Sequence, residues 1–64
     1  MSIEKSILQA ELQAEMRHRE VYANMLAARE FEGYPPDPDG QTAIQFRTHN
    51  NRVEALEAQI AELY

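Results

Sequence analysis

Residues 33–40 read Gly33-Tyr34-Pro35-Pro36-Asp37-Pro38-Asp39-Gly40, and this stretch holds every proline and glycine of the 64-residue chain. A glycine just after the last helical residue, followed closely by proline, is a strong signal for the end of a helix. Asp37 before Pro38 is a candidate N-cap for a second helix, and Asp39 is a competing cap. The stretch therefore predicts a helix at about 2–32, a loop at about 33–39 and a helix at about 40–64. A loop this short favours an antiparallel two-helix hairpin.

The composition on either side of this loop supports one helical domain and excludes several classes of protein. Alanine, glutamate, leucine and glutamine dominate both flanking segments, and all four favour helix. The chain has no cysteine, which excludes disulfides and thiolate metal sites. It also lacks an apolar run of about 18 residues and the apolar core of a signal peptide, so we expect a cytoplasmic protein without a membrane partner. A net charge of −5 disfavours direct binding to nucleic acid, because the phosphate backbone carries charge of the same sign.

The second segment carries a heptad seam, in which seam residues alternate at spacings of four and three. Such a seam is typical of a coiled-coil interface, and it leaves open whether the partner is the first helix or a second copy of the chain. His49 is a polar residue on this seam, a type of position that usually sets register or oligomeric state. The seam consists of Thr42, Phe46, His49, Val53, Leu56, Ile60 and Leu63.

The first segment has two apolar edges, about 120° apart at 100° per residue. One edge comprises Ile3, Ile7, Ala10, Ala14, Val21, Met25 and Ala28; the other comprises Leu8, Leu12 and Leu26. A hairpin covers only one edge, and a chain this short buries too little apolar surface to offset its chain entropy comfortably. The sequence therefore predicts an all-α hairpin that self-associates into a helical bundle, as a dimer or a higher oligomer. Its expected oligomer interface is Leu8, Leu12, Leu26, Phe46, His49, Val53, Leu56, Ile60 and Leu63.

The first helix also contains a candidate metal motif, the Glu-x-x-His of Glu15-Met16-Arg17-His18, with Glu11 one turn earlier. The stretch from Glu15 to Leu26 resembles the Glu-x-x-His helix of ferritin-like proteins. That resemblance implies a di-metal carboxylate site that uses Glu11, Glu15 and His18 together with a glutamate from another helix.

The expected pairing of the helices places position 15 opposite about position 58, which makes Glu57 the nearest candidate for that glutamate. An ordinary solvated face is the alternative interpretation, because Glu15 and Arg19 are spaced to form an ion pair along the helix.

A basic, amide-rich band crosses the middle of the predicted hairpin. Arg, His and Asn side chains together can hold phosphate oxygens, so one alternative function is the sequestration of an anionic small ligand such as a nucleotide. In architecture alone, with no shared motif, the predicted hairpin resembles the small phage proteins that sequester cyclic nucleotides, which are also oligomers of helical hairpins. The competing interpretation is ion pairing with glutamates inside the bundle. On the second helix the band consists of Arg47, His49, Asn50, Asn51 and Arg52.

Nothing in the sequence predicts catalysis or a bound cofactor. The chain has no glycine-rich phosphate loop and no cysteine nucleophile, and a hairpin offers no cleft that excludes water.

We expect a small acidic interaction protein that binds another macromolecule, most readily a protein, and could inhibit it. Bacteriophages and mobile elements encode many accessory proteins of this kind. The expected partner-binding residues are Glu54, Glu57 and Glu62, which could steer toward a basic surface, and Tyr34 in the loop.

Overall fold

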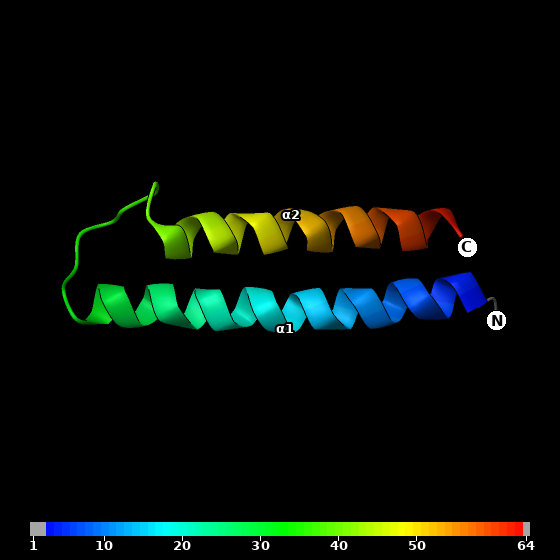
Figure 1. The fold of residues 1–64 in the computed structure, drawn as a ribbon, viewed down its shortest axis with the longest axis horizontal. Helices are drawn as coiled ribbons and strands as arrows, with labels where there is room; N and C mark the ends of the chain where they lie inside the picture. Colours follow the sequence, from blue (N-terminus) through cyan, green and yellow to red (C-terminus); the bar gives the residue numbers. More distant parts are fainter. Residues whose placement is uncertain (1–2, 64) are drawn as a thin grey trace.

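The computed structural model describes residues 3–63, which form two helices and, within that range, no strand. Helix α1 spans Ile3–Phe31 and helix α2 spans Gln41–Glu62. They lie side by side and antiparallel in a rod of 47 × 16 × 15 Å (Figure 1). The predicted all-α hairpin is confirmed, whereas the helix ends expected at residues 2 and 64 lie outside the described residues. Neither described helix combines the length and the apolar character needed to cross a bilayer.

Helix α1 ends at Phe31, and Gly33 follows as the helix stop that the sequence predicts. Gly33 has a φ of 88°, a left-handed conformation that glycine adopts without the clash of a Cβ atom. Its N–H donates to the carbonyl of Glu30, and the N–H of Tyr34 donates to the carbonyl of Arg29, both at 3.0 Å. These two bonds form a Schellman motif, which satisfies carbonyls that the end of a helix would otherwise leave unpaired. The Arg29 guanidinium lies 4.9 Å from the centre of the Tyr34 ring, so the tyrosine packs back on the end of α1.

Helix α2 begins at Gln41, close to the expected position of about 40, but its cap differs from the expectation. Its N-cap is Gly40, with no side-chain capping bond, so the predicted caps at Asp37 and Asp39 are wrong. Instead, the N–H of Gly40 donates to the carbonyl of Asp37 at 3.0 Å and closes a turn over residues 37–40. Aspartate first, proline second and glycine fourth is a favoured pattern for a type I turn. The aspartate therefore starts a turn that precedes the helix, and Arg47 Nη1 holds this turn by donating to the carbonyl of Pro38 at 2.8 Å.

The core of the hairpin is small. Among residues 3–63 only Val53 and Ile60 are buried, and Val53 is fully so. The other seam positions of α2 are half-buried, apart from Leu63, which is 41% exposed. The predicted seam therefore faces α1, and it is enclosed most tightly in the C-terminal half of α2.

On α1, the hairpin covers the leucine edge. Leu8, Leu12 and Leu26 are half-buried. On the other edge Ile3, at 80%, and Ile7, at 54%, are exposed, as are Val21 and Met25. The apolar edge left to solvent is thus the isoleucine edge, whereas the sequence-based assignment of the oligomer interface had used the leucine edge.

The register of the two helices also differs from the expectation. Glu15 contacts His49 and Arg52, instead of lying opposite position 58. The cause is the path of the loop: α2 begins well inside the end of α1, and the chain turns back over that end before entering α2 (Figure 1). Leu26 accordingly lines the same surface hollow as Thr42 and Ala43 in the first turn of α2.

Candidate functional site

The two histidines of the chain meet at the middle of the hairpin. His18 comes from α1 and His49 from α2, and their ring centres are 5.1 Å apart in an edge-to-face arrangement. The Tyr22 ring stacks on His49, with 5.5 Å between centres and 9° between planes. His49 is thus held by aromatic contacts with two α1 residues, while His18 remains exposed.

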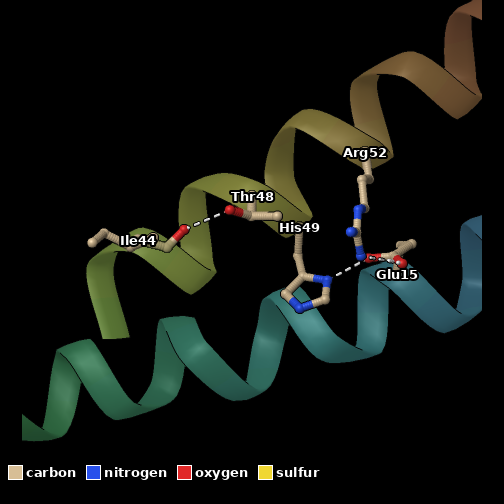
Figure 2. Close-up of polar contacts among 5 residues, drawn as sticks. All are labelled: Glu15, Ile44, Thr48, His49 and Arg52. Carbon is tan, nitrogen blue, oxygen red and sulfur yellow. Dashed lines mark hydrogen bonds and ion pairs between the residues drawn. The ribbon is translucent and has the colours of Figure 1, made fainter. Parts of the chain in front are cut away.

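Glu15 completes this cluster from α1. Figure 2 shows the His49 ring pointing from α2 toward α1, where its Nδ1 contacts a carboxylate oxygen of Glu15. Arg52 Nη1 donates to the other oxygen at 3.4 Å. The side chains of Glu15 and His49 are 18% and 12% exposed, so water is largely excluded from their contact.

The surroundings of Glu15 favour its ionised form. The hydrogen bond from His49 lowers the pKa of the Glu15 carboxyl below its ordinary value, and the positive charges of His49, Arg52 and His18 lower it further. Partial burial acts in the opposite direction. Since the net effect is a lowered pKa, Glu15 carries a full negative charge at neutral pH.

Glu15, His18 and His49 form what we call the histidine–glutamate cluster. Each residue offers one atom able to bind a metal, and these atoms all lie within 4.8 Å of one another. Two imidazoles and a carboxylate are donors used by zinc and by non-haem iron sites. Glu11 and Glu57, which the ferritin-like resemblance brought into consideration, are exposed and do not belong to this group.

Sequence reasoning found Glu15 and His18 but did not join them to His49. The expected register placed position 15 nearly two helical turns too far along α2. A usable signal was present, because His49 is the polar interruption of the α2 seam, and Glu15, His18 and Tyr22 form the polar arc between the edges of α1. Matching polar to polar positions would have given the observed pairing.

Four residues of the basic band on α2, Arg47, His49, Asn50 and Arg52, make side-chain contacts within the hairpin. Arg19 Nη1 donates to Asn50 Oδ1 at 3.2 Å, and the Asn50 amide donates to Glu54 at 3.5 Å. Arg47 binds the loop and Arg52 binds Glu15, as described above. Of the two arginines of the band on α2, Arg52 forms an ion pair with a glutamate across the hairpin, whereas Arg47 bonds to a loop carbonyl.

Thr48, next to His49, bonds to its own helix. Its hydroxyl donates to the carbonyl of Ile44 one turn earlier at 2.9 Å (Figure 2). This bond turns the hydroxyl toward the α2 backbone.

The expected partner-binding residues remain accessible. Glu54, Glu57 and Glu62 are exposed on α2, whose last turn holds no basic residue, and Tyr34 is 54% exposed. No family model matches the chain, and searches of curated proteins and of solved structures find no match either. Function is therefore inferred from the side chains that the hairpin brings together and those it leaves exposed.

Proposed function

We propose that this chain is a small association protein, which pairs with a second copy of itself through the isoleucine edge of α1 and uses its acidic face to bind a basic macromolecule. The observation that carries the proposal is the exposure of that edge. Ile3, Ile7, Val21 and Met25 are between 46% and 80% exposed along one side of a single helix. Aligned apolar side chains on one face are typical of an interface.

The small core of the hairpin supports the proposal that a second copy of the chain covers this edge. With Val53 and Ile60 as the only buried residues within 3–63, the hairpin alone buries little apolar surface. Chains of this size need an additional source of stability, and oligomerisation is a common one. The edge also contains small exposed residues, Ala10 between Ile7 and Val21 and Ala28 after Met25, so two α1 helices related by a twofold axis can approach closely.

The acidic face supports a basic partner. Glu54, Glu57 and Glu62 are exposed toward the C-terminal end of α2, where the partial negative charge of the helix dipole adds to theirs. A twofold assembly repeats this surface, and repeated charge of one sign accelerates encounter with an oppositely charged surface. Occluding a basic groove on a partner would inhibit that partner.

Sedimentation equilibrium tests the self-association. The wild-type chain is expected to sediment as an oligomer at micromolar concentration, and the double change Ile7→Glu with Val21→Glu is expected to dissociate it, since both charges enter the proposed interface. Gln13→Glu is the matched control, because it adds a charge at an exposed polar position of the same helix. A wild-type protein that sediments as a folded monomer, or a double variant that stays associated, would contradict the proposal.

A further inference from the structure

We propose that the histidine–glutamate cluster binds one first-row transition-metal ion, such as zinc, and that this ion links α1 to α2. The site is separate from the association surface proposed above. Its basis is placement: the chain has two histidines, on different helices, and the fold brings both to the same glutamate. One donor atom from each of the three residues lies within 4.8 Å of the other two.

The donors define the class of ion. Imidazole nitrogen suits zinc, iron, cobalt, nickel and copper, whereas calcium and magnesium take oxygen ligands. Zinc bonds of about 2.0–2.2 Å set neighbouring donors roughly 3.5 Å apart, so the more distant donors of the cluster must approach one another and the direct contact between His49 Nδ1 and Glu15 must open around an ion. His18 is exposed and can make this adjustment by rotating its side chain. With three protein donors, the remaining coordination positions fall to water.

The surroundings of the cluster are already organised for binding. His49 is held by stacking on Tyr22, and its hydrogen bond to Glu15 is the contact that a bound ion would replace. A histidine ring oriented by neighbouring groups loses little freedom when it becomes a ligand. The cluster is open to solvent on the side of the exposed His18, and an ion can enter from that side. Arg52 competes for Glu15, so a metal has to share the carboxylate with this cation.

This site differs from the one implied by the ferritin-like resemblance. That resemblance implies two metal ions and a glutamate from another helix, whereas the structure supplies His49 as the second-helix donor for one ion. Because the donors come from both helices, metal binding would also stabilise the folded hairpin. An ion held only by Glu15 and His18 would bind α1 alone.

Calorimetry and thermal unfolding with zinc test the site on the full, tag-free chain. We expect one zinc ion per chain and a higher unfolding midpoint with zinc, while magnesium leaves the midpoint unchanged. His18→Gln and His49→Gln are each expected to weaken zinc binding about tenfold or more, because each removes one ligand. Glu11→Gln is the matched control, since it removes an exposed carboxylate one turn from Glu15 and should leave zinc affinity unchanged. Arg52→Gln is expected to tighten binding by removing the competing cation.

Nuclear magnetic resonance of the imidazole rings gives a readout that does not depend on how a variant folds. In the wild-type chain, the resonances of both histidines should shift together and reach their end point at one zinc per chain. Absence of zinc binding, a shift of His18 alone, or a His49→Gln variant that folds and retains wild-type zinc affinity would each overturn the proposal.

Discussion

Two parts of the interface between α1 and α2 differ in character: we call the part around Val53 and Ile60 the apolar half and the part around His49 and Asn50 the polar half. In the C-terminal part of α2, Val53 and Ile60 are the buried residues of the described chain. In the middle, His49 and Asn50 meet Glu15 and Arg19 through directional contacts. Apolar burial is non-directional and tolerates some sliding of one helix past the other, whereas a hydrogen bond is lost when its partners move apart. The comparison indicates that the apolar half stabilises the hairpin and the polar half selects its register.

The apolar half is the place where a single change should have the largest effect. Val53→Asp puts a charge at a position with no solvent exposure, which costs several kcal/mol, comparable to the whole stability of a domain this small. We expect the helical circular dichroism signal and the cooperative urea transition to be lost. Ala58→Asp places the same charge at an exposed position of α2 and should retain both. Equal behaviour of the two variants would mean that the apolar half is not the main source of stability.

Substitution of the polar pair by apolar residues should raise the stability of the hairpin, the opposite of the effect in the apolar half. Replacing a poorly solvated ion pair by apolar residues is often stabilising, so Glu15→Leu with His49→Leu is expected to raise the free energy of unfolding by about 1–2 kcal/mol in urea titrations. His49→Leu alone should lower the free energy of unfolding, because it leaves the largely buried Glu15 carboxylate without its His49 partner. The double variant should also hold its register less firmly.

Spin labels can measure that loss of register, because the chain has no native cysteine. With Glu20→Cys and Asn51→Cys, both at exposed positions, the distance distribution between labels should broaden in the double leucine variant. A double variant that is less stable than the wild type, with an equally narrow distribution, would show that the polar contacts contribute stability instead of specificity.

The same contrast explains what could be predicted from the sequence. Periodicity and the loop residues predicted both helices, the helix stop at Gly33 and the inward face of α2, because these depend on local rules. The cap of α2 differs from the prediction because Asp37 can serve equally as a helix cap or as the first residue of a turn. The register followed from the three-dimensional path of that loop, which local rules do not determine. An error there moved Glu15 away from His49 and hid the histidine–glutamate cluster.

The smallest expected effect is the pH dependence of the polar half. The pKa of Glu15 is lowered in the folded chain from an ordinary value of 4.5, first by the hydrogen bond from His49 and then by the charges of His49, Arg52 and His18. A group whose pKa is lower in the folded state contributes stability above its unfolded pKa. That contribution is lost as the pH falls below 4.5 and through the folded value, when Glu15 becomes protonated in both states.

Urea unfolding of the wild type and of Glu15→Gln, measured with a chelator present from neutral pH downward, isolates this contribution from the other carboxylates. The wild type should be the more stable at neutral pH, and its advantage should shrink as the pH falls below 4.5, since protonated glutamate and glutamine are both uncharged. Glu11→Gln removes the same formal charge from an exposed position of α1 and controls for net charge. If Glu15→Gln matched the wild type at neutral pH, the contact between Glu15 and His49 would contribute no net stability. Register selection would then have to depend on other polar contacts, with Arg19 and Asn50 the first to test.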